Sequence, residues 1–588
     1  MIIKKLIFAA SLSAILLSNT ASAVIGPIKI SLNTEYRTSN PVIGSIATTI
    51  KLDSSAIERT GASTFTELLQ SIPSVSFEGG QGNLQSLRIR GNEASHTLLL
   101  LDGQKVTITG GQPNLDVIPV DQIERIEISK GPFSSLYGPG AIGGVIHIFT
   151  DKEANSVSSS KVDISMGSKG SKKINLNTYL KGEKSYLDIS LTDYHTDGID
   201  ATDDGDLDPI DRKTLGLNFG TEVTDITAIN LNILSTKADI QYDDSFGTPK
   251  PDNNLRQFNL GVTQKISEKY KISLDFMNQN TQRREAKYKL NAMSIINEID
   301  FDNSKLSLGL SNSVDKDIAN SKNIKHKDLF SQWQGLIFDN ELSIGARIVD
   351  HDKFSAHTTY NFNWARDLSS AIRVNGSYGS ATNIPDHYKN NLNIGVGKTS
   401  LKPERSKNLE LGLTGDYEWV DVGIKLYKSK VSDAFSYLDP DSNYLTPDAY
   451  YINDGIVNIQ GAELLINTDL LGWDFDMIFD FNKAIAASTD LQKGRRPNRS
   501  IGVNLSKTSG KWSRNINWSA HSWVWDKDNH SNGKLGGYGL LSLSTSYDFT
   551  ENLNVYLTRN NALDKDYEMA QGYKTLGKTS TFGLTYSF

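Results

Sequence analysis

The 588-residue chain contains no cysteine. In a secreted chain, this absence excludes disulfide bonds, structural metal sites built from thiolates and a cysteine nucleophile. The sequence also lacks any apolar stretch approaching the roughly 18 residues of a membrane-spanning helix. Its mean hydropathy is −0.37. That value suits a soluble protein and a transmembrane barrel equally, because only every second residue of a barrel strand meets lipid.

The net charge and the amino terminus indicate where the protein goes. The formal net charge of −7 argues against a nucleic-acid partner. A basic start at Lys4 and Lys5 is followed by an apolar run to about Leu17 and by the small exit residue Ala23. This order predicts a secretory signal peptide over residues 1–23. A membrane anchor is the alternative, but the apolar run is too short to span a bilayer.

The last residues of the chain alternate between two kinds of side chain. Phe582, Leu584, Tyr586 and Phe588 take turns with glycine, threonine and serine. Because successive side chains of a strand point to opposite faces, one face is aromatic and the other is small and polar. This pattern is typical of an outer-membrane barrel strand, with lipid outside and a polar lumen inside.

The same alternation recurs from about residue 160 onward, in short segments separated by Gly, Asn, Asp or Ser. At roughly 20 residues per strand with its share of turns, residues 153–588 predict a transmembrane antiparallel β-barrel of about 22 strands. The lumen of such a barrel is wide enough to need a plug. A soluble solenoid or propeller is the alternative, but it requires a repeated sequence period, and we find none.

Residues 46–152 precede the barrel and have the character of a small α+β domain. Helix-like segments come first, and strand-like runs follow at 87–90, 97–101, 123–128 and 143–148. We predict that this domain lies inside the lumen as the plug. The irregular residues 24–45 before it are predicted to form a mobile arm.

An ordered series of short motifs runs through both regions. In the plug region they are Ile89 to Gly91, Leu101 to Gly103, Ile123 to Ile128, Gly131 with Pro132, and Tyr137 to Ile146. In the barrel region they are Leu401 to Gly412, Asn453 to Glu463 and Asn560 to Tyr567. The series resembles the TonB-dependent outer-membrane receptors. That resemblance implies a monomeric, multi-pass outer-membrane protein that imports a small molecule with the help of the TonB protein.

Within that family, the run from Ile89 to Gly103 resembles the vitamin B12 (cobalamin) receptors, as do Asp564 to Glu568 and Gly572 with Tyr573. The resemblance implies cobalamin as the substrate. A ferric siderophore or haem is the alternative, because Phe133, Pro139 and residues 104–113 depart from the expected pattern.

Two other classes of outer-membrane protein fit the sequence less well. A passive porin needs an open lumen, which a plug would close. An outer-membrane lipase needs a Ser–His pair facing lipid, and the nine histidines show no such context. We therefore predict a transporter without enzyme activity and without a catalytic cofactor.

The position of residues 29–33 matches that of the family's TonB box, which here comprises Lys29, Ile30, Ser31, Leu32 and Asn33. Such a box must be an extended segment whose free backbone groups add as a strand to the edge of the partner's sheet. The alternation of Ile30 and Leu32 suits a strand. A leader without this role is the alternative.

Two acidic runs, over 200–211 and 239–252, lie between strand-like segments. Concentrated carboxylates repel one another unless they are solvated or bound to a hard cation such as calcium. Spacing alone leaves a solvated acidic loop equally open. The resemblance implies structural calcium in extracellular loops, held by Asp200, Asp206, Asp208, Tyr242, Asp243 and Asp252.

The resemblance also implies ligand contacts at plug apices that face outward. By position these are Asn83, Leu84, Gln85, Gly111 and Gln112. Amide side chains suit a ligand rimmed with amides, as cobalamin is, since an amide donates and accepts at once. Ordinary loop polarity is the alternative.

Four cations of the plug are predicted to pair with carboxylates of the lumen and so hold the plug in place. They are Arg88, Arg90, Arg125 and Lys130. His96 and His195 have no partner at metal-binding spacing, so we assign them no role.

Overall fold

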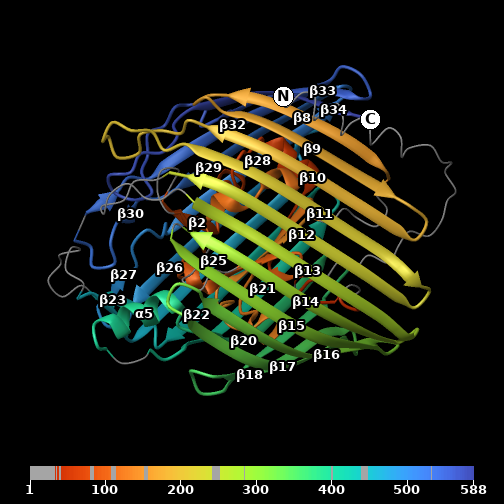
Figure 1. Ribbon diagram of the computed structural model, residues 1–588, viewed down its shortest axis with the longest axis vertical. Coiled ribbons are helices and arrows are strands. Elements are labelled where there is room, and N and C mark those ends of the chain that lie inside the picture. The colour runs from red at the N-terminus through yellow and green to blue at the C-terminus, as the bar shows by residue number, and fades with distance from the viewer. Residues whose placement is uncertain are drawn as a thin grey trace.

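The computed structural model describes residues 34, 36–38, 41–79, 85–106, 114–150, 157–241, 252–283, 285–398, 401–438, 448–531 and 533–588. A small mixed unit of helices and strands lies inside a large β-barrel (Figure 1). Among the described residues, no helix is long and apolar enough to cross a membrane. The signal peptide predicted over residues 1–23 lies outside the described residues.

The inner unit, which we call the plug, is built on a five-stranded sheet of order β1-β6-β7-β4-β5. Its strands are β1 (Thr49–Asp53), β2 (Val75–Glu78), β3 (Ser86–Ile89), β4 (Thr97–Leu101), β5 (Gln104–Lys105), β6 (Arg125–Lys130) and β7 (Gly144–Phe149), with β2 and β3 forming a separate hairpin. Its helices are α2 (Ser54–Thr60), α3 (Phe65–Leu69) and α4 (Ser134–Tyr137). Capping explains two of the helix starts, because Asp53 accepts from the Ala56 amide at 2.7 Å and Thr64 forms a capping box with Glu67.

The plug sheet is buried on both faces because the barrel surrounds it. Leu98, Leu99 and Leu100 are successive residues of β4, and each is at most 1% exposed. Leu99 belongs to a core cluster that also contains Tyr194 and Leu255 of the barrel. A strand covered on both faces has no polar face, which explains why β4 is a continuous apolar run.

In the described part of the chain, 22 antiparallel strands close into the barrel, and β34 pairs with β8 at the seam. They are β8 (Ser159–Gly167), β9 (Lys172–Lys181), β10 (Ser185–Thr196), β11 (Ile210–Thr224), β12 (Thr227–Ile240), β13 (Asp252–Ser267), β14 (Tyr270–Arg283), β15 (Ala286–Asp300), β16 (Ser304–Asp317), β17 (Lys322–Ile337), β18 (Asn340–His351), β19 (His357–Asp367), β20 (Ile372–Asn383), β21 (Glu404–Tyr417), β22 (Val420–Ser432), β25 (Ile456–Asp469), β26 (Asp474–Ala486), β28 (Arg499–Ser509), β29 (Trp512–His521), β32 (Tyr538–Asp548), β33 (Leu553–Asn560) and β34 (Thr579–Ser587). The short β27 (Leu491–Gln492) pairs with the end of β26. The predicted fold, a plugged barrel of about 22 strands, is confirmed.

The alternating side chains take the two faces that the sequence predicts. In the last strand, Phe582, Leu584 and Tyr586 are 36–52% exposed on the outer surface. In β21, Leu409 and Leu411 point outward, whereas Glu410 between them is buried against the plug. The outer surface is therefore the apolar one, as a lipid-facing barrel requires.

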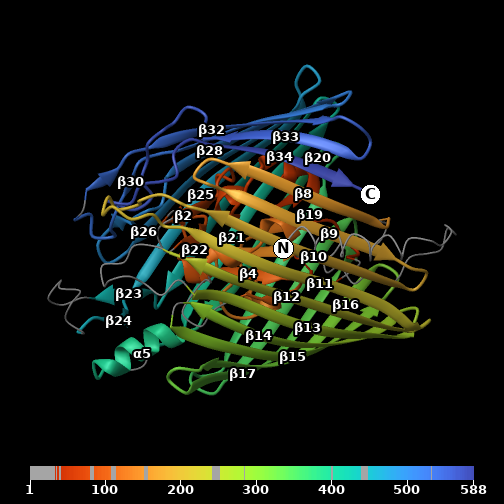
Figure 2. The same cartoon turned by 45° about the horizontal axis from the view of Figure 1, so that its top comes forward.

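The two ends of the barrel differ in their connections. At the end that carries the C-terminus, the strands are joined by short turns such as 225–226 and 418–419. At the other end, the connections are longer and carry α5 (His387–Gly395) and the hairpins β23 (Phe435–Leu438) with β24 (Tyr450–Asn453) and β30 (Val524–Trp525) with β31 (Lys534–Leu535) (Figure 2). We call these the turn end and the loop end. Outer-membrane barrels have short periplasmic turns and longer extracellular loops.

Candidate functional site

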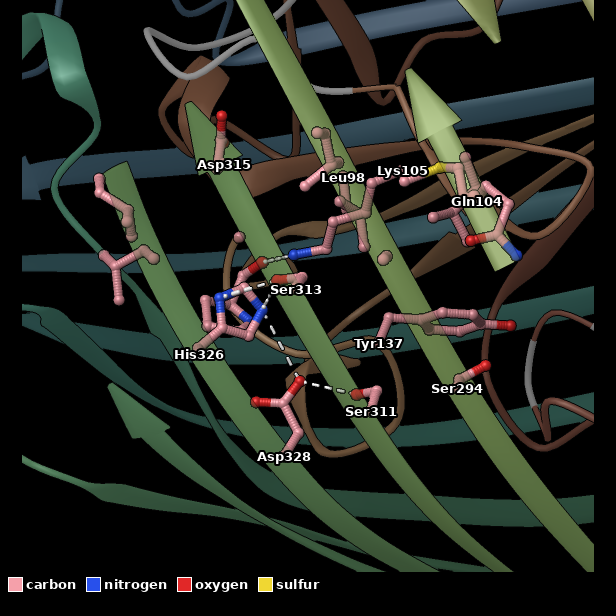
Figure 3. Close-up of a pocket in the computed structure, with 18 of the residues that line it drawn as sticks. Leu98, Gln104, Lys105, Tyr137, Ser294, Ser311, Ser313, Asp315, His326 and Asp328 are labelled. Atoms are coloured by element: carbon pink, nitrogen blue, oxygen red, sulfur yellow. Dashed lines mark hydrogen bonds and ion pairs between the residues drawn. The ribbon is translucent and has the colours of Figure 1, made fainter. Parts of the chain in front are cut away.

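A cavity of about 180 Å³ lies between the plug and strands β14–β18, toward the loop end. Lys105 of β5 and Tyr137 of α4 line it from the plug. Ser313, His326 and Asp328 line it from the wall. The Lys105 side chain extends from the plug toward Ser313 and His326 (Figure 3). The cavity is therefore a polar space shared by the two parts of the molecule.

The wall side of the cavity is an ordered hydrogen-bond network. Asp328 Oδ2 accepts from Ser311 Oγ at 2.9 Å and from Arg347 Nη2 at 2.7 Å. Ser313 Oγ lies 2.8 Å from Nε2 of His326. Asp328 Oδ1 has no hydrogen-bond partner among the described residues. The network thus fixes the Asp328 carboxylate in the wall of the cavity.

Lys105 closes the cavity from the plug side. Its Nζ donates to the carbonyl oxygen of Pro139 at 2.8 Å. Burial lowers the pKa of Lys105 to about 8, because removal from water disfavours the charged ammonium. The lysine is a cation at neutral pH and loses its charge as the pH rises through this pKa.

Four of the five predicted ligand contacts, Asn83, Leu84, Gly111 and Gln112, lie outside the described residues. The fifth, Gln85, is only 4% exposed. Its Oε1 accepts from the Thr66 hydroxyl, and its Nε2 donates to Asp116 Oδ2 at 3.2 Å. Gln85 ends the first predicted apex and Asp116 follows the second, so this bond ties the bases of the two apices together. Gln85 supports the plug here, and its contact with ligand stays a prediction.

Asp116, which accepts this hydrogen bond from Gln85, is also buried. Its Oδ1 has no hydrogen-bond partner among the described residues. Burial raises the pKa of Asp116 to about 6. The carboxyl group is therefore ionised above that pH, where the bond from Gln85 becomes charge-assisted and stronger.

Three of the predicted calcium ligands, Asp200, Asp206 and Asp208, lie in the described loop after β10. Asp200 accepts from the amides of Asp204 at 3.1 Å and Gly205 at 3.0 Å. Asp208 is buried and accepts from the Ala201 amide at 3.3 Å. Two of the others, Tyr242 and Asp243, lie outside the described residues, and Asp252 begins β13 opposite Asp239.

Within the described ranges, no three His, Asp or Glu side chains are grouped so that they can hold a metal ion. The described carboxylates alone therefore do not form a calcium site, and such a site would need Tyr242 and Asp243 to complete it. Calcium binding stays a prediction.

The predicted TonB box at residues 29–33 lies outside the described residues, but the segment that follows it is packed in the lumen. Thr34 and Thr38 are fully buried, and Tyr36 is 1% exposed. Thr34 Oγ1 donates to Glu127 of the plug at 2.5 Å, and Thr38 Oγ1 donates to Glu298 of β15 at 2.5 Å. The described part of the predicted arm is therefore fixed, and this corrects the expectation that residues 24–45 are mobile throughout.

Two of the four predicted plug anchors are confirmed. Arg90 donates to Glu410 of β21 at 2.8 Å and to Glu463 of β25 at 2.9 Å and 3.0 Å. Lys130 Nζ lies 2.9 Å from the same Glu463. The side chains of these two cations and of their two carboxylate partners are all buried. This charged cluster joins the plug directly to the wall.

Among the described residues, the ion pairs of Arg88 and Arg125 are formed within the plug, so the prediction was wrong for both. Arg88 pairs with Glu78, because the β2–β3 hairpin brings the two together. Arg125 pairs with Glu127 at 3.1 Å, since residues two apart on a strand share a face.

Sequence reasoning missed a further contact between plug and wall. His96 Nε2 lies 2.8 Å from Glu404 Oε2, and both side chains are buried. The two residues are 308 positions apart, so nothing local to His96 marks the pair. The one available signal was Glu404, which belongs to the barrel motif over 401–412. The cavity residues Lys105, His326, Asp328 and Arg347 carried no sequence signal.

Two family models match this chain. The model described as TonB-dependent Receptor Plug Domain matches residues 42–145. The model described as TonB dependent receptor-like, beta-barrel matches residues 159–562. The matched ranges coincide with the plug and with the barrel up to β33.

Individual proteins resemble the chain along nearly its whole length. It is 25% identical over 580 residues to the vitamin B12 transporter BtuB of Photobacterium profundum, covering 94% of this chain and 95% of that protein. The siderophore receptor PirA of Acinetobacter baumannii has a similar structure, with a TM-score of 0.78, 15% identity, and coverage of 92% of this chain and 98% of that one. A ferric enterobactin receptor (PfeA) structure from Pseudomonas aeruginosa gives a TM-score of 0.77, 16% identity, and coverage of 92% and 98%.

Proposed function

The chain belongs to the TonB-dependent receptors, and on that premise we propose that it binds cobalamin at the cell surface and imports it into the periplasm using the TonB complex. Members of this family are outer-membrane transporters and receptors, not enzymes. The loop end then faces the outside of the cell and the turn end faces the periplasm.

One observation supports cobalamin above other substrates. It is the likeness to a vitamin B12 transporter, which runs along 94% of the chain and 95% of that protein. The likeness to siderophore receptors, at 15–16% identity, bears on the fold alone.

A ferric siderophore or haem is the second candidate, and the cavity supplies the observation that favours it. Arg37, Lys105 and Arg347 line the cavity and would attract an anionic iron complex. The carboxylates of Asp275, Asp315, Asp328 and Asp386 line the same space. Since these four carboxylates outnumber the three cations, the cavity gives no net preference for an anion, and cobalamin remains the first proposal.

Uptake of radiolabelled cyanocobalamin by cells that lack any other cobalamin receptor tests this function. We expect uptake only when this protein and TonB are both present. Uptake that persists without TonB, or uptake of a ferric siderophore in place of cobalamin, would contradict the proposal.

Calcium in the outer loops is part of the same proposal. We expect Asp206→Ala with Asp243→Ala to weaken cobalamin binding and to remove its calcium dependence. Each carboxylate lost removes a charged oxygen ligand, and a calcium ion that bridges two loops would order them before cobalamin arrives. The measurement is the dissociation constant of cyanocobalamin in calcium and in chelator.

A matched control is Asp225→Ala with Asp302→Ala, which removes the same charge from two turns at the turn end. This control is expected to keep both the affinity and the calcium dependence. Equal affinities of the unmodified protein in calcium and in chelator would show that the acidic loops are merely solvated.

The plug apices give a separate prediction. We expect Gln85→Ala with Gln112→Ala to weaken cobalamin binding from a few-fold to about a hundred-fold, because each neutral hydrogen bond contributes about 0.5–1.5 kcal/mol. Gln264→Ala, which removes an amide that accepts from Thr227 near the turn end, is expected to leave the affinity unchanged. Barrel unfolding is expected to stay the same in all three proteins. An unchanged dissociation constant in the double variant would remove the apices from the ligand site.

A further inference from the structure

A basic patch lies on the outer surface of the barrel near the loop end, where β21 begins and where β22 and β26 end. Its five side chains are Arg405 and Lys407 of β21, Lys428 and Lys430 of β22, and Lys483 of β26. All five are exposed, whereas neighbours in sequence such as Ser406, Ser429 and Asn482 are buried. Because successive residues of a strand point to opposite faces, the five cations point away from the lumen.

The register of the strands brings the cations of the basic patch together. Lys407 of β21 lies directly opposite Lys430 of β22. Lys428 and Lys483 lie on either side of Gln460 of β25. Residues directly opposite one another on paired strands have Cβ atoms about 4.5–5.5 Å apart, and like charges in that position destabilise the pair. The barrel therefore holds the charges of Lys407 and Lys430 together at a cost in stability.

The strand positions that flank the basic patch carry neutral side chains. Ser380 of β20 is opposite Lys407, and Asn458 of β25 is opposite Lys430. Within the described ranges, none of the five cations forms an ion pair with a carboxylate. The positive charge of the basic patch is therefore not offset by the protein wall around it, and an anion from outside the protein can offset it.

The basic patch lies where the apolar outer surface ends. Toward the turn end, the next outward residues on the three strands are Leu409, Leu426 and Phe481, which are 37–54% exposed. Tyr378 of β20 lies opposite Leu409, and its ring centroid is 6.0 Å from that of Tyr360. Aromatic girdles mark the two interfaces of an outer-membrane barrel. The basic patch is therefore at the level of the lipid headgroups in the outer leaflet.

From this placement we propose that the basic patch binds the phosphate groups of lipid A, the phosphorylated glycolipid of the outer leaflet. Its acyl chains lie against the apolar surface around Leu409 and Leu426, and its phosphates lie among the lysines. Lysine binds phosphate as a point charge, and clusters of basic side chains at a membrane surface attract anionic lipids. A phosphate between Lys407 and Lys430 offsets their mutual repulsion. This binding site is independent of the substrate that the receptor imports.

The test is an equilibrium titration of the purified receptor in detergent with fluorescently labelled lipid A. Bisphosphorylated lipid A is compared with the same lipid after both phosphates have been removed. We expect the dephosphorylated lipid to bind about tenfold more weakly, because it keeps the acyl chains and loses the charge that the lysines attract. The titration needs neither cobalamin nor TonB, so it leaves the proposed import function untouched. Equal affinity for the two lipids would overturn the proposal.

Two matched double variants locate the lipid on the barrel. Lys407→Gln with Lys430→Gln is expected to weaken the binding of bisphosphorylated lipid A about tenfold. The control is Lys213→Gln with Lys237→Gln, which removes another pair of opposed, outward lysines near the loop end. Lys213 lies 3.7 Å from Asp193, so part of that charge is already offset, and the control is expected to keep its affinity.

The change of gel mobility on heating shows whether each variant has a folded barrel. If the first variant does not fold, Lys428→Gln with Lys483→Gln takes its place and is expected to have the same effect. An unchanged affinity in the folded variant of the basic patch, or an equal loss of affinity in the control, would overturn the site.

Discussion

Deleting residues 28–33 is expected to abolish cobalamin uptake and to leave cobalamin binding at the cell surface unchanged. These residues contain the proposed TonB box and directly precede Thr34, which is held by Glu127 and Tyr137 of the plug. A partner that pulls on the box would therefore pull on the plug. Binding takes place at the opposite end of the barrel, so it does not depend on the box.

A pair of single substitutions separates strand addition from a simple loss of chain length. Ile30→Pro removes a backbone N–H that an added strand must donate, and we expect it to reduce uptake as the deletion does. Ile30→Ala keeps that N–H and is expected to retain most of the uptake. Normal uptake by the deletion strain would contradict energy coupling through this segment.

Arg90→Ala is expected to release the plug from the wall. Burial disfavours the charge of Arg90, but Glu410 and Glu463 outweigh this and raise the pKa of Arg90 well above its usual value. Removing the guanidinium leaves buried Glu410 without its partner and Glu463 with Lys130 alone, and breaking such a buried pair costs about 3–5 kcal/mol. We expect a loss of plug stability of that order, and raised leakage of large antibiotics into cells.

Arg125→Ala is the matched control, because Arg125 belongs to the same sheet but pairs with Glu127 of the plug and lies over Phe149 at 3.8 Å. It is expected to leave antibiotic leakage at its original level. Calorimetry of the purified proteins gives plug stability, and growth on large antibiotics reports the seal. Equal leakage in the two variants would mean that the Arg90 cluster does not hold the plug.

The sequence predicted the parts of this molecule that depend on local patterns. The alternation of Phe582, Leu584 and Tyr586 was enough to place them on the outer face, because strand geometry fixes which side chains share a face. The number of strands followed from the length of the barrel region, at roughly 20 residues per strand with its share of turns. The anchors Arg90 and Lys130 were identified because a buried plug cation needs a carboxylate nearby.

The remaining features depend on contacts between distant residues. His96 and Glu404, and Thr38 and Glu298, are pairs separated by hundreds of positions, so no local pattern marks them. The segment after the predicted TonB box has no periodicity, and its packing against β15–β18 follows only from the shape of the lumen. Arg88 and Arg125 were misassigned because a hairpin and a shared strand face supplied carboxylates nearer than the wall.

Equilibrium binding of cyanocobalamin, a ferric siderophore and haemin to the purified protein shows which substrate this receptor takes. We expect saturable binding of cyanocobalamin that is tighter in calcium than in chelator, and no saturable binding of the two iron compounds. Tight binding of the siderophore or haemin without binding of cyanocobalamin would contradict it.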